Sequence, residues 1–347
     1  MTKIKTAIVG ATGFTGSELA RLIALHPSMD LVAITSESSA GEKFSSIHPQ
    51  FFGLVDQILI RADEIEEKNI DLVFLAVPHG VSMHYIELWK NADFKIVDLS
   101  GDYRLNDPET YESWYGKKHS FTEAFDYAVY GLPEFFSKEI SKARLVANPG
   151  CYPTSSILGV YPLIKENLVD ANRIVIDSKS GATGAGIKAK SGTLYSQINE
   201  NFNAYAIGNH RHTVEIEQIL TGKTKSATKV QFTPHLLPVD RGILSTIYAQ
   251  KTAEMELNTQ RLHELYREVY ADQPFIRIRE EVPGIKEVRG TNFCDLYPTY
   301  DPRTNNIIVI STIDNLMKGA AGQAIHNANL MFGLKETAGL DLISLKP

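Results

Sequence analysis

A glycine-rich turn near the start of the sequence constrains the fold more than any other feature. The apolar run from Thr6 to Val9 is typical of a buried parallel strand, and residues 17–25 follow a helical pattern. Between them, Gly10–Gly16 has the spacing G-x-x-G-x-x-G, which permits a tight turn and close backbone approach to a ligand. A strand, a glycine turn and a helix in this order predict a dinucleotide site with the pyrophosphate at the helix N-terminus.

Strands and helices continue to alternate through the first half of the chain. Apolar strands are predicted at 31–35, 72–77, 95–99 and 145–147. In a doubly wound parallel sheet, ligands bind beyond the carboxyl ends of the strands. We therefore expect a Rossmann-type α/β domain over residues 1–150. Its expected cofactor-binding residues are Gly10, Thr12, Gly13, Phe14, Thr15, Gly16, Pro78 and Ser100.

The loop after the second strand bears on which nicotinamide cofactor is bound. An acidic residue here binds the ribose hydroxyls of NAD and repels a 2′-phosphate, whereas hydroxyl groups can donate to that phosphate. The loop offers Ser36, Ser38 and Ser39, with Glu37 among them. The serines favour NADP(H), and Glu37 argues in the opposite direction.

A cysteine at a predicted helix start is the second landmark. The strand at 145–147 runs through Asn148-Pro149-Gly150 into Cys151, and an apolar helical run follows. A helix N-terminus stabilises a thiolate, but its dipole contributes only about 0.3–1 kcal/mol. Lowering a thiol pKa from about 8.5 to about 6.5 needs about 2.7 kcal/mol, so a basic partner is expected. We predict that Cys151 is a nucleophile assisted by a histidine.

Two histidines are candidates for that partner. His210 and His212 flank Arg211 on a turn before a helix whose cap is expected near Thr213. Glu215, one turn further on, either orients His212 or is an ordinary exposed helix glutamate. A zinc site needs three or four ligands, and the sequence offers no clear Cys or His cluster to complete one, so no metal is predicted.

The second half of the chain predicts a different architecture. Strands are expected at 173–179, 229–234, 242–251, 275–280, 292–299 and 307–313, and helices at 212–220, 260–270 and 318–332. Strands outnumber helices, which indicates an α+β catalytic domain over residues 151–315 with a mostly antiparallel or mixed sheet and helices on one face.

Charge and cysteine content exclude several partner classes. Thirty-five Lys and Arg against 41 Asp and Glu give a net charge of -6, so no nucleic-acid or membrane partner is expected. The sequence also lacks an apolar run long enough to span a bilayer and a signal-peptide pattern. With only Cys151 and Cys294, a disulfide framework is excluded and a cytoplasmic location is expected. Cys294 lies in an alternating strand pattern and is expected to be a small buried side chain.

These motifs resemble the N-acetyl-gamma-glutamyl-phosphate reductase family, within the wider aspartate-semialdehyde dehydrogenase group. The resemblance covers almost the whole chain and rests on the segments GATGFTGSELARL, DLSGDYRL, NPGCYPT, SGATGAG, GNHRHTVEIEQ and DNLMKGAAGQA. It implies NADPH-dependent reduction of N-acetyl-L-glutamyl 5-phosphate to the 5-semialdehyde, with release of phosphate, in arginine biosynthesis.

The resemblance also implies residue roles. Cys151 matches the nucleophile, His212 the acid/base, and Glu215 a residue that orients substrate or histidine. A homo-oligomer, dimer or tetramer, is implied, with residues 316–347 forming a C-terminal helix that packs back on the nucleotide domain. Further expected cofactor contacts are Ser180, Gly181 and Asn315. Expected substrate-binding residues are Arg104, Asn148, Lys188, His210, Arg211 and Arg241.

Two positions depart from the family's pattern, and other functions stay open. The family often has a basic residue where this chain has Glu37, and commonly Arg-Lys where it has Ile187-Lys188. The alternatives are a reductase of aminoadipyl or aspartyl phosphate, a cysteine hydrolase, and a non-catalytic nucleotide-sensing protein. A hydrolase does not need the glycine turn, and a sensor does not need both Cys151 and His212.

Overall fold

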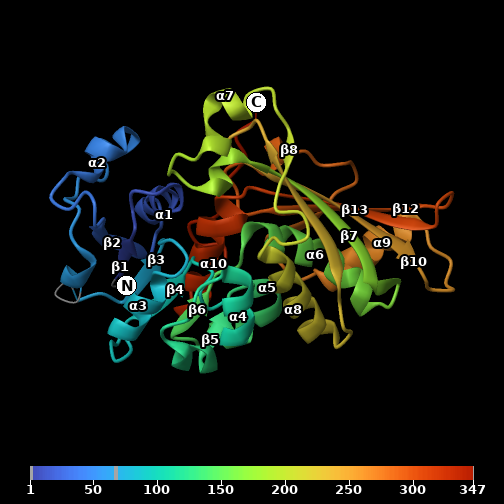
Figure 1. Cartoon of the computed structure of the whole chain (residues 1–347), viewed down its shortest axis with the longest axis horizontal. Coiled ribbons are helices and arrows are strands. Elements are labelled where there is room, and N and C mark those ends of the chain that lie inside the picture. Colours follow the sequence, from blue (N-terminus) through green and yellow to red (C-terminus); the bar gives the residue numbers. More distant parts are fainter. Residues whose placement is uncertain (1–2, 66–68, 347) are drawn as a thin grey trace. The chain divides into compact units, whose positions relative to one another are not determined.

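The chain forms two compact units in a computed structural model that describes residues 3–65 and 69–346. Unit 1 runs to Pro149 and includes Ala320–Leu342, and unit 2 comprises Gly150–Gly319 and the residues from Ile343 onwards. Figure 1 colours the elements of both units along the sequence.

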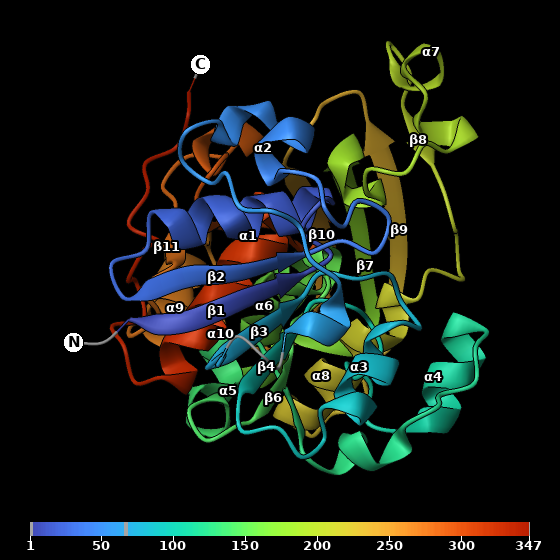
Figure 2. The same ribbon diagram turned by 90° about the vertical axis from the view of Figure 1, so that its left-hand side faces the viewer.

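Unit 1 is built on a six-stranded parallel sheet with the order β2-β1-β3-β4-β6-β5. Its core strand residues, among them Ala7 and Ile8, are fully buried, as expected for a sheet covered on both faces. Figure 2 shows α1 running along β1 and β2. The elements are β1 (Ile4–Val9), α1 (Phe14–Ala24), β2 (Met29–Thr35), α2 (Phe44–Ile47), η1 (Pro49–Phe51), η2 (Ala62–Glu64), β3 (Leu72–Leu75), α3 (Ser82–Leu88), β4 (Lys95–Asp98), α4 (Pro108–Tyr115), η4 (Thr122–Asp126), β5 (Ala128–Tyr130), α5 (Pro133–Ile140), β6 (Leu145–Ala147) and α10 (Gly322–Met331). The predicted Rossmann-type sheet is confirmed.

The C-terminal helix belongs to unit 1. Helix α10 packs on α1, α5 and β4. The Asn327 side-chain amide donates to the Gly131 carbonyl at 2.8 Å and to Asn148 Oδ1 at 3.0 Å. His26 and Asn329 form a further buried hydrogen bond of 3.1 Å between α1's end and α10. The predicted return of this helix to the nucleotide-binding sheet is confirmed.

Unit 2 is built on a seven-stranded mixed sheet with the order β11-β12-β13-β10-β7-β9-β8. Pairs β11–β12 and β7–β9 are parallel and the others antiparallel. Helices α6, α8 and α9 pack on the strands (Figure 1). The elements are α6 (Cys151–Lys165), β7 (Val169–Gly181), η5 (Ala182–Ala185), η6 (Ser191–Thr193), α7 (Tyr195–Ile198), β8 (Asn203–Ala204), α8 (His212–Thr224), β9 (Val230–Leu237), β10 (Ile243–Lys251), α9 (Thr259–Val269), β11 (Ile276–Ile278), η7 (Ile285–Glu287), β12 (Cys294–Asp301), β13 (Asn306–Ile313) and the π-helix η8 (Met317–Ala321). The predicted mixed sheet is confirmed.

Helix α6 approaches the sheet closely because small residues face it. A Cβ at Gly159 would lie 2.4 Å from Ile247 Cδ1. The Ser155 hydroxyl lies 2.9 Å from the hydroxyls of both Ser245 and Ser311, which lie on neighbouring strands. Ser311 in turn donates to the Ser155 carbonyl at 2.9 Å, so α6 is fixed on the sheet by buried polar contacts as well as packing.

Some sequence-based boundaries were wrong. Helix α8 begins at His212 as predicted, but its N-cap is Arg211 and not a residue near Thr213, and it continues to Thr224 instead of ending at residue 220. The helix expected at 318–332 divides into the π-helix and α10. Cys294 is fully buried, as predicted. Its Sγ lies 3.6 Å from the Ser311 hydroxyl, a polar contact that the sequence did not predict. Over the two described ranges, no helix is sufficiently long and apolar to cross a membrane.

Candidate active site

Cys151 is the first residue of α6, which follows β6 after a short turn. Gly150 is the N-cap, and the first turn contains no acidic residue that would compete for the helix N-terminus. Cys151 is partly exposed. An α-helix has no intrahelical acceptor for its first N–H groups, so this position favours negative charge on the thiol and on a bound oxygen.

Glu215 anchors the turn in front of the cysteine. Its side chain is fully buried, and its Oε1 accepts the Gly150 N–H at 2.8 Å. The alternative of an exposed helix glutamate is therefore wrong. Because Gly150 immediately precedes Cys151, this bond ties the start of α6 to α8.

The two histidines lie together beside Tyr152, the residue that follows Cys151. The backbone N–H of His212 donates to Nδ1 of the His210 ring at 3.1 Å, and the two ring centroids are 4.7 Å apart. The Tyr152 ring packs edge-on against both histidine rings, with centroid distances of 5.7 Å to His210 and 5.9 Å to His212. Burial and the adjacent Arg211 lower the pKa of His210 to about 4. His210 is therefore neutral at neutral pH.

Two phenols lie next to the histidines: Tyr152 is buried, whereas Tyr205 is 39% exposed. The hydroxyls of Tyr152 and Tyr205 lie 3.1 Å apart. Burial raises the pKa of Tyr152 well above its usual range and that of Tyr205 to about 12. Negative charge on Cys151 contributes to both elevated pKa values, so the thiol lies within electrostatic reach of both phenols. Sequence reasoning missed these two tyrosines.

The glycine loop after β7 is held by Asn315. The Asn315 amide donates to Thr183 Oγ1 at 2.9 Å, and its Oδ1 accepts the Gly242 N–H at 2.8 Å. A Cβ at Gly181 would lie 2.5 Å from the Asp240 carbonyl oxygen, so this glycine permits the close chain approach. Ser180 is buried at the end of β7, beside Gly181.

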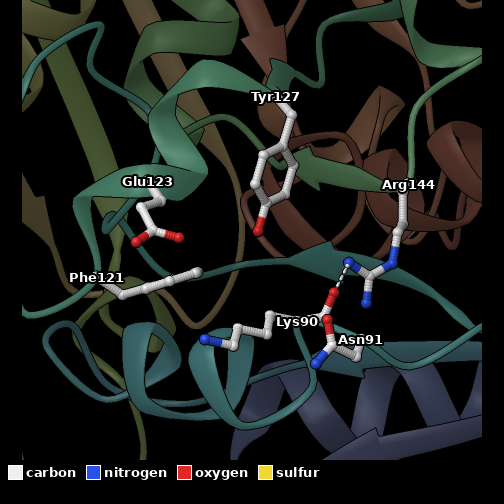
Figure 3. Close-up of a pocket in the computed structure, with 6 residues that line it drawn as sticks. All are labelled: Lys90, Asn91, Phe121, Glu123, Tyr127 and Arg144. Carbon is white, nitrogen blue, oxygen red and sulfur yellow. Dashed lines mark hydrogen bonds between the residues drawn. The ribbon is translucent and has the colours of Figure 1, made fainter.

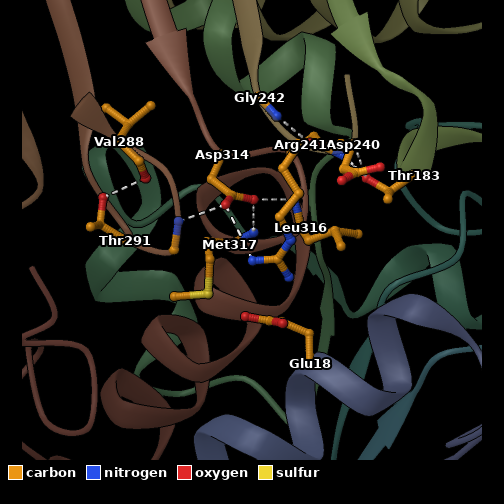
Figure 4. A network of polar contacts seen from close by, with 12 residues as sticks. Glu18, Thr183, Asp240, Arg241, Gly242, Val288, Thr291, Asp314, Leu316 and Met317 are labelled. Carbon is orange, nitrogen blue, oxygen red and sulfur yellow. Dashed lines mark hydrogen bonds and ion pairs between the residues drawn. The ribbon is translucent and has the colours of Figure 1, made fainter. Parts of the chain in front are cut away.

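Arg241 pairs with a buried carboxylate in the same region. Its Nη1 lies 3.3 Å from Asp314 Oδ2, and Figure 4 shows this pair within a wider polar network. Lys188, by contrast, is exposed beyond the glycine loop. Arg211 lies at the N-cap of α8, next to both histidines.

The glycine turn of unit 1 fits a bound pyrophosphate. Gly10 has a φ of 83°, and a Cβ at Gly16 would lie 2.4 Å from the Gly10 carbonyl oxygen, so the turn is tight. Gly13 is the N-cap of α1, and the first turn, with Phe14 and Thr15, contains no acidic residue. The backbone N–H groups and the helix dipole can therefore attract an anion without repulsion from a nearby carboxylate in the first turn.

Hydroxyl groups extend from this turn to the end of β2. Thr12 Oγ1 lies 3.5 Å from the Ser36 hydroxyl, which lies 3.4 Å from that of Ser38. Ser39 follows in the same loop, and Pro78 is exposed in the loop after β3. The donor set suits the phosphates and ribose of a dinucleotide.

The side chain of Glu37 is held by neighbouring donors. Its carboxylate lies 3.4 Å from the Arg61 guanidinium and accepts the Ala62 N–H at 3.2 Å. The Tyr85 hydroxyl donates to it at 3.4 Å. The charge that argued against NADP is therefore balanced by an arginine from another part of unit 1.

Ser100 belongs to a buried carboxylate cluster at the end of β4. Its hydroxyl donates to Asp98 Oδ2 at 2.8 Å, and the Ser82 hydroxyl donates to the same oxygen at 3.0 Å. Asp102 accepts the Ser82 hydroxyl at 2.9 Å. Burial, and then the neighbouring Asp102 charge, raise the pKa of Asp98 to about 7.

Arg104 and Asn148 connect strand ends within unit 1. Arg104 Nε donates to the Asn148 carbonyl at 2.7 Å, and its Nη2 donates to the Leu99 carbonyl at 3.0 Å. The Asn148 amide donates to the Ala320 carbonyl at 3.2 Å. Both side chains are therefore part of the framework at the carboxyl edge of the sheet.

A cavity of about 410 Å³ in unit 1 does not overlap the predicted site residues. Arg144 Nη1 donates to the Lys90 carbonyl at 2.7 Å, and Figure 3 shows this bond among the lining residues. Its lining residues are Lys90, Asn91, Phe121, Glu123, Tyr127 and Arg144. Across residues 3–65 and 69–346, no group of three or more His, Cys, Asp or Glu side chains could hold a metal ion.

The fold and the placement of the cysteine define the semialdehyde dehydrogenase class. Residues 5–143 match its NAD binding domain and residues 151–315 its dimerisation domain. Among solved structures, the fold is similar to aspartate semialdehyde dehydrogenase II from Vibrio cholerae complexed with ASA (TM-score 0.72, 16% identity, 96% of this chain and 99% of that one). It is also similar to the Candida albicans enzyme with NADP (TM-score 0.69, 17% identity, 95% and 99%).

Closer relatives specify the family. The chain is 45% identical to the N-acetyl-gamma-glutamyl-phosphate reductase of Clostridium novyi over 99% of both chains. It is 47% identical to that of Citrifermentans bemidjiense over 99% of this chain and 100% of the other. This chain belongs to the N-acetyl-gamma-glutamyl-phosphate reductase family, as the sequence motifs predicted.

The raised pKa of Asp98 predicts a pH dependence of stability. Folded Asp98 binds its proton more tightly than the unfolded chain does, so its contribution to stability is full below about pH 4 and is lost as pH rises through about 7. Asp98→Asn stays neutral and lacks this loss. The melting temperature of Asp98→Asn should therefore rise relative to wild type between pH 5 and pH 8 in calorimetry. A difference that does not change with pH would contradict the assignment.

Proposed function

We propose that this protein catalyses the NADPH-dependent reduction of N-acetyl-L-glutamyl 5-phosphate to N-acetyl-L-glutamate 5-semialdehyde, releasing phosphate, as in arginine biosynthesis. The proposal rests on Cys151 at the start of α6, with His212 beside the next residue, Tyr152, and Glu215 bonded to the preceding one, Gly150. Relatives 44–47% identical over 99% of the chain carry the name of this reductase.

In the first half of the reaction, the Cys151 thiolate attacks the acyl carbonyl carbon. A C–S bond forms, the bond from that carbon to the phosphate oxygen breaks, and phosphate leaves with the electron pair. The N–H groups at the start of α6 stabilise the negative charge that develops on the carbonyl oxygen. The product is a thioester on Cys151.

His212 moves the protons. Its position at the start of α8 places it beside Tyr152, and the pairing of thiolate and imidazolium keeps the sulfur nucleophilic. In the second half of the reaction, His212 would give a proton to the carbonyl oxygen as the thioester is reduced. It takes the same proton back as the C=O bond re-forms, the C–S bond breaks with its electron pair going to sulfur, and the aldehyde leaves. Glu215 acts at a distance by holding Gly150.

NADP(H) would be held mainly by unit 1. The backbone of Gly10–Gly16 would bind the pyrophosphate, and Ser36, Ser38 and Ser39 would bind the adenosine ribose and its 2′-phosphate. When bound, NADPH supplies the hydride that reduces the thioester. Ser100, Ser180, Gly181 and Asn315 are proposed as further contacts to the cofactor.

The substrate's phosphate and carboxylate need cationic partners. Arg211 and Lys188 are the first candidates, because Arg211 adjoins the histidines and Lys188 is exposed. Arg104, Asn148 and Arg241 hold framework contacts in addition to any substrate contact. His210, neutral and beside His212, would contribute a hydrogen bond and not a charge.

Arg61 explains how the chain accepts a 2′-phosphate despite Glu37. The guanidinium lies 3.4 Å from Glu37, at the loop where the ribose is expected. We propose that Arg61 supplies the positive charge that the family often places at position 37.

A homo-oligomer is proposed to form through unit 2. Residues 151–315 match a dimerisation domain, and the segment between β7 and α8 exposes large apolar side chains. Tyr195 is 79% exposed and Ile207 is 65% exposed. Apolar surface of this kind is typical of a subunit interface, and a second copy of the chain is its proposed partner.

Replacing the nucleophile tests the covalent mechanism. Cys151→Ala should lower kcat by at least about a thousandfold, and His212→Asn by about a hundredfold or more. Both should keep wild-type NADPH affinity. The assay follows nicotinamide absorbance in the reverse direction with semialdehyde, phosphate and NADP⁺. Substantial activity in Cys151→Ala would exclude the thioester route.

Removing Arg61 tests cofactor selectivity. Arg61→Ala should weaken NADP⁺ binding about tenfold or more, which corresponds to about 1.4 kcal/mol, and leave NAD⁺ binding unchanged. Titration calorimetry measures both affinities, with Arg21→Ala as a control for loss of a surface arginine on α1. Equal weakening of both cofactors would show that Arg61 does not read the 2′-phosphate.

Charged substitutions test the proposed interface. Tyr195→Glu combined with Ile207→Glu should dissociate the oligomer, because each substitution would place an unpaired negative charge in the subunit interface. Light scattering coupled to size exclusion should then report a smaller mass. Leu345→Glu, at a residue 73% exposed on the C-terminal tail, is the matched control. An unchanged mass for the double variant would refute this interface.

A further inference from the structure

Gly319 lies directly against the nucleophile residue. A Cβ at this position would lie 2.7 Å from Cys151 Cβ and 3.2 Å from Cys151 Cα. Ordinary contacts of a Cβ lie at 3.4–4 Å, so a side chain here could not coexist with the present position of Cys151. Gly319 is buried, and its φ lies outside the range that favours glycine. The close approach to Cys151, and not backbone freedom, is what requires a glycine.

The segment that carries Gly319 has an unusual conformation. Met317–Ala321 forms a π-helix, a rare element that occurs frequently at functional sites. The Gly319 N–H donates to the Asp314 carbonyl at 3.0 Å. This bond spans five residues and places Gly319 one wide turn after Asp314.

The Asp314 side chain fixes the start of this turn. Its Oδ1 accepts the N–H groups of Leu316 at 2.8 Å and Met317 at 3.1 Å. Its Oδ2 accepts the Gly290 N–H at 2.7 Å and pairs with Arg241 at 3.3 Å. Figure 4 shows the carboxylate at the centre of these contacts.

The burial of Asp314 makes its contacts costly to break. Asp314 is fully buried, and a buried carboxylate is tolerated when its hydrogen bonds and a counter-charge are all in place. The adjacent Asn315 binds Thr183 and the Gly242 N–H. Two consecutive side chains therefore fix the segment to three loops of unit 2.

We propose that Asp314 and Gly319 are positioning residues for Cys151. Asp314 holds the π-turn in place, and the turn presents bare backbone at Gly319 as a wall that sets where the Cys151 Cα and Cβ lie. The inference rests on the proposed function insofar as Cys151 is the nucleophile. It goes beyond that function by assigning the position of the thiol to a segment far from it in the sequence.

The proposal predicts a loss of thiol reactivity. A methyl group at position 319 must displace either the turn or Cys151, and a misplacement of about 1 Å can cost about a hundredfold in rate. Gly319→Ala should therefore lower kcat by about a hundredfold. In the protein without substrate or cofactor, alkylation of Cys151 by iodoacetamide at pH 7 should slow about tenfold, and the pH midpoint of the alkylation rate should rise.

The alkylation measurement separates this proposal from the proposed function. It is made by mass spectrometry of the full chain, with the fully buried Cys294 as an internal reference. Because no substrate is present, an error in the assigned substrate does not affect the result. NADP⁺ affinity and the melting curve verify that each variant is folded.

Two further variants complete the design. Gly222→Ala is the control, because among the described residues no heavy atom lies within 4 Å of a Cβ at this helical position. It should alkylate as wild type does. Asp314→Asn keeps the size of the side chain but loses its charge, and it should also slow the alkylation of Cys151. If Gly319→Ala does not fold, the alkylation rate of Asp314→Asn tests the positioning role instead. Wild-type alkylation rate and pH midpoint in the folded variants would overturn the proposal.

Discussion

The hydrogen bond from the Gly150 N–H to the buried Glu215 carboxylate is the contact on which the site depends. A buried carboxylate must be satisfied by donors, so moving α8 away from the start of α6 would cost Glu215 the Gly150 N–H. One bond therefore fixes the turn that carries Cys151 and the helix that begins with His212. In the proposed mechanism, the helix N-terminus contributes only about 0.3–1 kcal/mol to thiolate formation, and the histidine supplies the remainder.

Unit 1 also has a helix N-terminus with a glycine N-cap and no acidic residue in its first turn. Gly13 caps α1 as Gly150 caps α6, and neither first turn carries an acidic residue. One helix start is suited to a pyrophosphate and the other to a thiolate and an oxyanion. The surrounding side chains decide which anion is accepted: small hydroxyls beside α1, and a histidine pair with two phenols beside α6.

The sequence predicted the features that depend on local patterns. The parallel sheet, the start of α6 at Cys151 and the mixed second sheet followed from apolar periodicity and glycine position. The burial of Glu215, the balance of Glu37 by Arg61 and the contact of Gly319 with Cys151 join residues far apart in the sequence. A single sequence carries no signal for such pairs, which is why the roles of Glu215 and Glu37 stayed open and Gly319 was missed.

The acyl-enzyme on Cys151 is the central claim, and trapping it tests the claim most directly. The protein without cofactor is mixed with N-acetyl-glutamyl phosphate, quenched rapidly in acid and digested for mass spectrometry. The account predicts an N-acetyl-glutamyl group on the peptide that contains Cys151, formed together with one phosphate released per chain. Phosphate released while Cys151 stays unmodified would contradict it.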